Sequence, residues 1–216
     1  MGGQRKIMFK KLEMLSVMSV FILITSIILV INTMTRENEF LAHSTDIQKA
    51  SVQGAAYAIN LQLMNKQKHV RLFIEEYSKL IMHLDWYPED EITLNNIHNR
   101  LQQRFPDFLA YTITDTAGTP KLTDFDSLVG QACQNDLNDF ADKLKRKRGR
   151  PGNEIFIHPQ AFNYHYDIMV PLSPGQESRI FFASFYLDQI VDILRTHEVP
   201  GQSLMLVRQS VPDLIE

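Results

Sequence analysis

One stretch near the N-terminus carries no charged side chain over 22 residues, from Met14 to Thr35. A helix of this length extends about 33 Å at ~1.5 Å per residue, enough to cross a hydrocarbon core of about 30 Å. A cleaved signal peptide usually has a shorter apolar core that ends in small residues. A core helix of a soluble protein alternates apolar and polar faces. Neither pattern is present, so the stretch predicts a transmembrane helix at 14–35.

The charges that flank this stretch predict its orientation. Four bases precede it, whereas Arg36 is the one base close behind it. The four are Arg5, Lys6, Lys10 and Lys11. The positive-inside rule then makes residues 1–13 a cytoplasmic tail of a single-pass protein in the inner (cell) membrane. Residues 36–216 are expected in the periplasm.

Behind the membrane segment, apolar side chains recur at the three- and four-residue spacing of a helix. They are Ile59, Leu63, Val70, Phe73, Tyr77, Leu80 and Leu84. We expect one long helix over 36–85, continuous with the membrane span, with Gly54 as the place for a kink. Its first half is polar and rich in small residues and cannot bury a broad face alone, which favours a homodimer through this stalk. A plain core helix is the alternative.

The remaining sequence, 86–216, alternates helices with β-branched and aromatic strands. Helices are expected at 91–105, 136–148 and 188–197, and strands at 108–115, 120–123, 154–158, 164–170, 179–186 and 203–208. This order predicts an α+β fold with an antiparallel sheet. The long helix must lie across one sheet face, because both carry apolar surface.

Composition narrows the possible functions. The chain has 216 residues, 44% of them hydrophobic and 22% charged, with a formal net charge of −3. These values are typical of folded protein and exclude a disordered or collagen-like chain. The single cysteine, Cys133, excludes an intrachain disulfide, and we expect it to be a small buried hydrophobe.

No pattern of residues typical of an active site is present. The seven histidines form no H-E-x-x-H motif and no pair with CxxC, and neither a G-x-S-x-G motif nor a P-loop occurs. We therefore expect no enzyme, no cofactor and no metal site. His158 and His165 can face each other on neighbouring strands, where hydrogen bonding at the strand ends is favoured over metal binding.

A basic run, KLKRKRGR at 143–150, stands out in an otherwise mixed surface pattern. We interpret it as the solvated end of a helix, where bases balance the helix dipole. Contact with anionic lipid head groups is the alternative. No nucleic-acid partner is expected outside the cytoplasm.

Three stretches resemble the extracytoplasmic Cache (PAS-like) sensor regions of bacterial transmembrane receptors. They are the strand–Asp–x–x–Gly hairpin 113–118, the pair Ile157-His158-Pro159 with 164–171, and the late strand 200–206. The resemblance covers roughly residues 10–216 and is greatest to regions that precede GGDEF/EAL diguanylate cyclase and phosphodiesterase modules. It implies a Cache-like sensor domain at 86–216, built together with the preceding helix, that binds a small ligand in a pathway linked to cyclic-di-GMP.

The chain also departs from such receptors. It shows no second membrane span, no GGDEF or EAL signature and no histidine-kinase phosphoacceptor motif, so the output module is missing. Three interpretations stay open: a truncated, non-signalling receptor remnant, a stand-alone sensor acting through a partner, and a membrane-anchored scaffold that binds a protein.

A sheet cupped by a long helix leaves room for a small pocket that is mostly apolar with a few polar anchors. The candidate ligand-binding residues are Tyr111, Tyr164, Tyr166, Asp167, Phe185, Arg71 and Trp86. Alternation along the strand places Tyr164 and Tyr166 on one face, and His165 and Asp167 on the other. If Tyr166 points inward, Asp167 is expected to cap the outer face. An amine, an amino acid or a carboxylate each fits, and a structural role competes at every position.

Overall fold

The computed structural model describes residues 2–122, 130–146, 155–158, 164–172, 179–207 and 214–215. Contacts divide the chain into two units, residues 1–52 and 53–216. The basic residues 147–150, Pro159 and the segment 173–176 between two expected strands lie outside the described residues.

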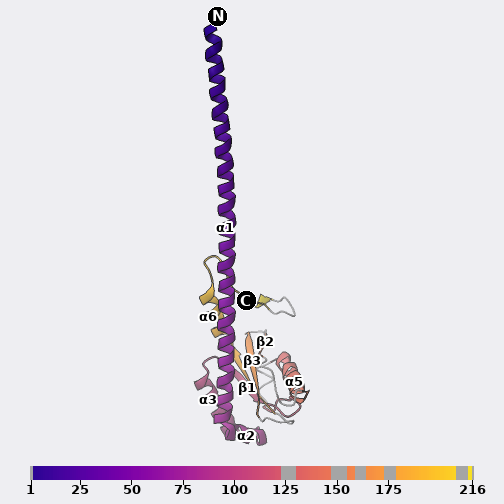
Figure 1. The fold of residues 1–216 in the computed structure, drawn as a ribbon. Coiled ribbons are helices and arrows are strands. Elements are labelled where there is room, and N and C mark those ends of the chain that lie inside the picture. Colours follow the sequence, from indigo (N-terminus) through magenta and orange to yellow (C-terminus); the bar gives the residue numbers. More distant parts are fainter. Residues whose placement is uncertain are drawn as a thin grey trace. The chain divides into compact units, whose positions relative to one another are not determined.

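The first unit consists of the N-terminal part of helix α1 (Gly2–Glu76) (Figure 1). The residues expected to form a separate tail at 1–13 belong, from Gly2 on, to the same helix. The large apolar side chains between Val20 and Ile31 are exposed. The helix is long and apolar enough there to cross a membrane, and so much exposed apolar surface is unfavourable in water.

Threonine hydroxyls within the apolar stretch form hydrogen bonds with the helix itself. The hydroxyl of Thr25 donates to the carbonyl of Phe21 at 3.0 Å, and that of Thr33 donates to Leu29 at 2.9 Å. Such bonds to the preceding turn remove the cost of burying a free hydroxyl in lipid. The two threonines are therefore compatible with a membrane span.

The long helix expected over 36–85 breaks at Tyr77 and not at Gly54. Helix α1 passes through Gly54 without a break and ends at Glu76, after which Tyr77 leads into α2 (Ser78–Trp86). A Cβ at Gly54 would lie 3.0 Å from the ring of His197. The glycine thus allows close approach of another helix, and the helix break lies where Tyr77 packs on Phe73 with ring centroids 4.7 Å apart.

Helix α3 (Glu91–Arg104) matches the prediction to within one residue. Asp90 caps its N-terminus, because its Oδ1 accepts a hydrogen bond from the backbone N–H of Ile92 at 3.2 Å. Pro106 follows the C-cap residue Phe105 and cannot continue the helix.

The four main strands form one antiparallel sheet. They are β1 (Phe108–Ile113), β2 (Ile155–His158), β3 (His165–Pro171) and β4 (Ile180–Tyr186), in the spatial order β1-β4-β3-β2. The meander expected of these last three strands is thereby confirmed, and β3 and β4 each begin one residue later than predicted. The hairpin after β1 is reduced to a bridge between Thr114 and Pro120.

The remaining elements are two helices and a small ribbon. Helix α5 (Gln131–Arg146) begins five residues earlier than predicted, α6 (Asp188–His197) has the predicted bounds, and β5 (Leu206–Val207) pairs with β6 (Leu214–Ile215). The final strand is therefore shorter than the 203–208 expected.

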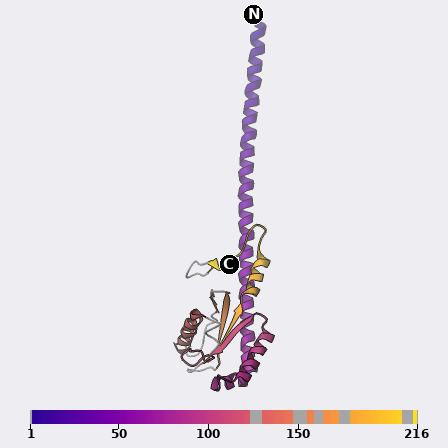
Figure 2. The same cartoon turned by 180° about the vertical axis from the view of Figure 1, so that it is seen from behind.

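Both faces of the sheet are covered (Figures 1 and 2). Alternate residues of β4 enter two separate cores: Phe181 and Phe185 pack with Phe73 of α1, whereas Phe182 packs with Phe140 of α5. The sheet is therefore a middle layer between α1 to α3 on one face and α5 on the other. The predicted α+β fold, with the long helix across one sheet face, is confirmed.

Candidate functional site

Three of the seven predicted ligand residues belong to the core between α1 and the sheet. Tyr166 and Phe185 are register partners whose rings stack at 5.5 Å. Tyr111 stacks on Phe181 at 5.9 Å, and its hydroxyl donates to the carbonyl of Leu94 at 3.2 Å. Their rings fill the interior of the described domain and support its packing.

The other predicted residues lie elsewhere. Arg71 is exposed on α1, Trp86 is 71% exposed at the end of α2, and Tyr164 is 38% exposed before β3. The structure does not bring the seven residues together, because they are distributed over the two cores and the surface. Ligand binding by any of them stays a prediction.

Asp167 differs most from its expected place. Alternation along β3 does separate it from Tyr166, as predicted, but Asp167 is fully buried beneath α5 and does not cap an exposed face. The hydroxyl of Ser184, its register partner on β4, donates to Asp167 Oδ1 at 2.6 Å. The expectation failed because α5 covers the second sheet face.

Asp167 belongs to a buried polar cluster with Cys133 and His165. The sulfur of Cys133 lies 3.2 Å from His165 Nε2, which lies 3.7 Å from Asp167 Oδ1. Burial, together with the negative charge of Asp167, raises the pKa of the Cys133 thiol. The cluster is not a nucleophilic triad, since the carboxylate approaches the same ring nitrogen that faces the sulfur. Cys133 is buried, as predicted, but its sulfur contacts the polar side chain of His165.

A second buried polar group lies on the opposite sheet face. Lys66 of α1 reaches Asp107 at 2.5 Å, and the Tyr166 hydroxyl donates to the other carboxylate oxygen at 3.3 Å. Burial, and then the charge of Asp107, raise the pKa of Tyr166. The phenol therefore stays a neutral donor. This group joins α1 to Asp107, the residue before β1, and to Tyr166 on β3.

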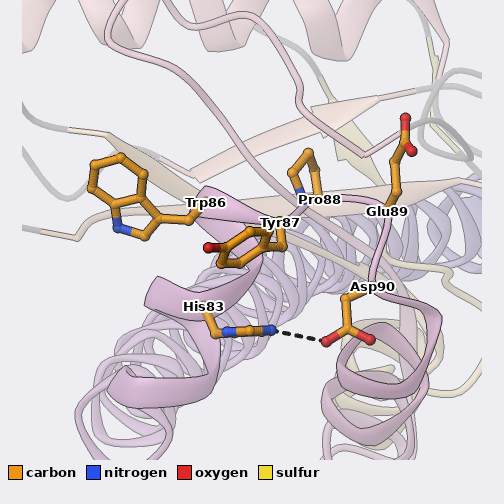
Figure 3. A pocket seen from close by; sticks show the side chains of 6 residues that line it. All are labelled: His83, Trp86, Tyr87, Pro88, Glu89 and Asp90. Carbon is orange, nitrogen blue, oxygen red and sulfur yellow. Dashed lines mark hydrogen bonds and ion pairs between the residues drawn. The ribbon is translucent and has the colours of Figure 1, made fainter.

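A surface pocket of about 550 Å³ lies at the connection between α2 and α3 (Figure 3). Its lining residues are His83, Trp86, Tyr87, Pro88, Glu89 and Asp90. His83 Nε2 lies 2.9 Å from Asp90 Oδ2, and the rings of His83 and Tyr87 are 5.0 Å apart. The pocket thus combines aromatic walls with two carboxylates.

Asp90 supplies a negative charge to this pocket. A hydrogen bond from the Thr93 hydroxyl at 2.8 Å, helped by His83, lowers the pKa of the Asp90 carboxyl. The group is therefore ionised at neutral pH. Aromatic faces beside carboxylates favour a small organic cation over an anion.

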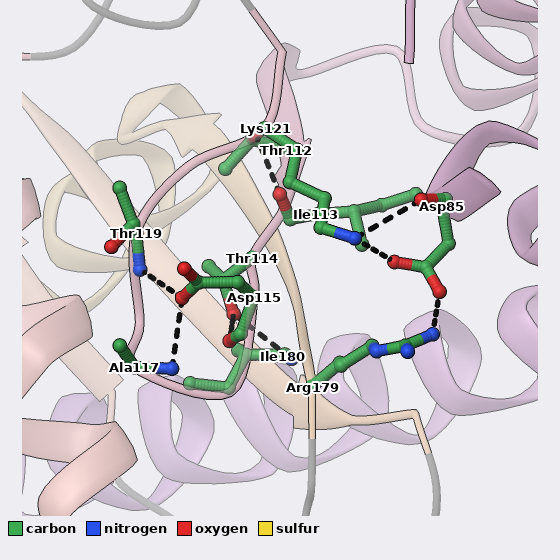
Figure 4. Close-up of polar contacts among 10 residues, drawn as sticks. All are labelled: Asp85, Thr112, Ile113, Thr114, Asp115, Ala117, Thr119, Lys121, Arg179 and Ile180. Atoms are coloured by element: carbon green, nitrogen blue, oxygen red, sulfur yellow. Dashed lines mark hydrogen bonds and ion pairs between the residues drawn. The ribbon is translucent and has the colours of Figure 1, made fainter. Parts of the chain in front are cut away.

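An ionic cluster connects the pocket to the sheet (Figure 4). Asp85, next to Trp86, accepts from Lys121 Nζ at 2.5 Å and also pairs with Arg179 at the start of β4. The guanidinium of Arg179 lies 6.0 Å from the Trp86 ring. The cluster therefore joins the end of α2, beside the pocket, to Lys121 and to the residue that precedes β4.

The hairpin after β1 is held by its aspartate. Asp115 Oδ1 accepts hydrogen bonds from the backbone N–H groups of Ala117 and Thr119, both at 2.8 Å (Figure 4). Gly118 adopts φ +95°, a left-handed conformation that favours glycine. The Asp–x–x–Gly pattern thus has a structural role here, as a self-bonded turn.

Sequence reasoning found one residue of the pocket, Trp86, and missed the rest. It left Tyr87–Asp90 between two expected helices and attached no chemistry to these residues, although an aromatic-rich segment that contains two acids was a usable signal. It also missed the Cys133–His165 contact, which no local spacing indicates across 32 residues.

No protein-family model matches this chain, and the search of curated proteins finds no relative of it.

Proposed function

We propose that this chain is a membrane-anchored extracytoplasmic sensor, Cache-like in its sheet region, that binds a small organic cation in the pocket between α2 and α3. The observation that carries the proposal is the pocket itself, where Trp86 and Tyr87 lie beside the carboxylates of Glu89 and Asp90. The N-terminus would lie in the cytoplasm, the sensor domain in the periplasm, and the output in a cyclic-di-GMP pathway.

The position of the pocket supports a role in signalling. Trp86 ends α2, and α2 is separated from α1 by Tyr77 alone. A ligand that changes the packing of α2 therefore acts on the end of a helix that contains the apolar N-terminal stretch. Asp85 and Arg179 would carry the same change into the sheet.

A small shift of α1 would be the transmitted signal. The ligand stabilises the packing of α2 to which it binds more tightly. In a homodimer, this change in packing would slide or rotate the paired stalk helices. Exposed apolar side chains in the stalk, among them Phe40, Ile47 and Val52, support such pairing.

A second candidate function, a scaffold for a protein partner, rests on one observation. Met82, Trp86, Tyr87 and Ile92 are all more than 60% exposed around the same connection. Clustered exposed apolar residues are typical of protein-binding surfaces. The scaffold would use these side chains and would not need the carboxylates of the pocket.

The only tryptophan of the chain gives a direct test. The full chain in detergent micelles is titrated with tetramethylammonium, an alkyl amine, and acetate as an anionic control, while Trp86 emission is recorded. The sensor proposal expects saturable changes with the cations, weakened by Asp90→Asn. Asn99→Ala, in a separate pocket on α3, is the matched control. If neither cation causes a saturable change in Trp86 emission, the ligand assignment is overturned.

Membrane topology is tested separately. A reporter that is active in the cytosol alone is fused behind Glu216 in cells, and in a second fusion at the same position it is replaced by a reporter that is active in the periplasm. The proposal expects activity from the periplasmic reporter. Activity of the cytosolic fusion overturns the extracytoplasmic placement.

A further inference from the structure

The geometry points to a metal site of the zinc type, formed by Cys133, His165 and Asp167 between α5 and the sheet. The three side chains come from two elements that are distant in sequence, and each is at most 1% exposed. Their ligand atoms all lie within 4.8 Å of one another. This site is separate from the proposed cation pocket and does not depend on it.

The elements place these donors on one face. His165 and Asp167 are two residues apart on β3, so their side chains leave the same side of the sheet. Cys133 lies in the first turn of α5, the helix that covers this side. Docking of α5 therefore brings the sulfur to the imidazole.

The separations fit one shared ion. Around a tetrahedral zinc with bonds of ~2.3 Å to sulfur and ~2.1 Å to nitrogen and oxygen, neighbouring ligand atoms lie about 3.4 to 3.6 Å apart. The observed distances are 3.2 Å from Cys133 Sγ to His165 Nε2 and 3.7 Å from that nitrogen to Asp167 Oδ1. Small side-chain adjustments would bring the three donors to such an ion.

The donor types select the class of metal. One thiolate, one imidazole and one carboxylate suit Zn²⁺, whereas Mg²⁺ and Ca²⁺ prefer oxygen ligands throughout. Coordination converts the Cys133 thiol to a thiolate, and its proton leaves to solvent. Three protein ligands leave a fourth position for water or another group.

The surroundings of the carboxylate also fit a metal ligand. Ser184 on β4 donates to Asp167 Oδ1 at 2.6 Å. Hydrogen bonds of this kind hold ligating carboxylates in place, and their removal typically weakens metal binding by about 10- to 100-fold. Ser184 would therefore be a positioning residue that never contacts the ion.

Binding would join α5 to β3. The contact between them also contains apolar side chains, among them Leu137, Phe140 and Met169. An ion that binds the folded chain and not the unfolded one stabilises the fold by RT ln(1 + c/Kd), where c is the concentration of the free ion. Metal would therefore raise the unfolding temperature.

The test uses the untagged full chain in detergent micelles, freed of metal with a chelator and then titrated with Co²⁺ and Zn²⁺. We expect one ion per chain, a thiolate-to-cobalt charge-transfer band in the near ultraviolet, its loss on addition of Zn²⁺, and a higher unfolding temperature with Zn²⁺. Binding that lacks the charge-transfer band, or no binding at one ion per chain, overturns the site.

Variants assign the site to its residues. Cys133→Ser should remove the charge-transfer band, Asp167→Asn should weaken Zn²⁺ binding by more than about 100-fold, and Ser184→Ala should weaken it by about 10- to 100-fold. Asp167→Asn keeps the side-chain shape, so it decides the question if Cys133→Ser does not fold. His69→Ala, which removes an exposed histidine of α1 that lies in neither site, should leave binding unchanged. Unchanged binding in Cys133→Ser and Asp167→Asn would overturn the assignment.

Discussion

The ammonium group of Lys66 lies 2.5 Å from Oδ1 of Asp107, and the two side chains are 6% and 4% exposed. The ammonium also lies 5.4 Å from the ring centroid of Phe105 and 5.0 Å from that of Phe185. Two charges are thus removed from water and compensated by each other, by aromatic faces and by the Tyr166 hydroxyl. This contact fixes α1 against the sheet at one position.

Removing either partner should strongly destabilise the domain. Lys66→Met or Asp107→Asn should each lower the free energy of unfolding, Lys66→Met by about 3–5 kcal/mol, because it leaves a buried carboxylate without its counter-charge. The double variant should recover part of the loss. Urea unfolding of the full chain in micelles gives the free energy of unfolding for the unchanged chain, the two single variants and the double variant. If the losses of the two single variants simply add up in the double variant, the two side chains are not coupled.

Gly118 should tolerate no side chain. Its φ is +95°, and an added Cβ would lie 3.0 Å from Ala141 Cβ and 3.0 Å from the carbonyl oxygen of Leu137. Gly118→Ala should therefore cost about 1–3 kcal/mol of stability through backbone strain and displacement of α5.

Gly130 provides the matched control for this prediction. A Cβ there would meet no atom within 4 Å, so Gly130→Ala should be neutral in the same unfolding experiment. Equal effects of the two alanine variants would mean that the close approach of α5 to the hairpin is not maintained in solution.

Features set by local sequence were predictable. The bounds of α3 follow from the Asp90 cap and from Pro106, and the strands of the meander follow from their β-branched and aromatic runs. Tyr166 and Asp167 were correctly assigned to opposite faces, because alternation is a property of any strand.

Features set by tertiary contacts were not predictable. The break at Tyr77 has no proline or glycine to signal it; the ring is held by Phe73 and by Arg100, whose guanidinium lies 4.7 Å from it. Likewise, the burial of Asp167 and its contacts with Cys133 depend on where α5 docks. Hydrophobic spacing indicates that a helix buries one face. It does not indicate which face of the sheet the helix packs on.

The folded chain should lose stability at alkaline pH. Burial raises the pKa of the Tyr111 phenol and that of the Tyr166 phenol above 10.0. The unfolded chain releases these protons from about pH 9 upward, whereas the folded chain keeps them, so unfolding becomes more favourable as pH rises.

Thermal unfolding between about pH 8 and about pH 11 measures this effect. Tyr111→Phe and Tyr166→Phe should each flatten the alkaline decline, since each removes one proton that the unfolded chain would release. Tyr87→Phe, at an exposed position, should leave the slope unchanged. A slope that is the same in all variants would show that these phenols ionise equally in both states.

Introduced cysteines should form disulfides along the stalk of a homodimer. The one native thiol, Cys133, is buried, so it does not compete in oxidation of single-cysteine variants. Ile47→Cys and Tyr57→Cys change exposed positions on α1, whereas Ala55→Cys changes a position that is 3% exposed.

Oxidation in membranes should therefore cross-link Ile47→Cys or Tyr57→Cys and leave Ala55→Cys monomeric, because Ala55 packs within its own chain and cannot reach a second copy. Cross-linking that repeats about every 3.5 residues would indicate paired helices, and an even yield at all positions would indicate random collision. If no position between Asp46 and Ala58 forms a dimer, with or without an added cation, the stalk cannot transmit a signal as proposed. Because this outcome leaves Trp86 titrations unaffected, it separates the mode of signalling from ligand binding itself.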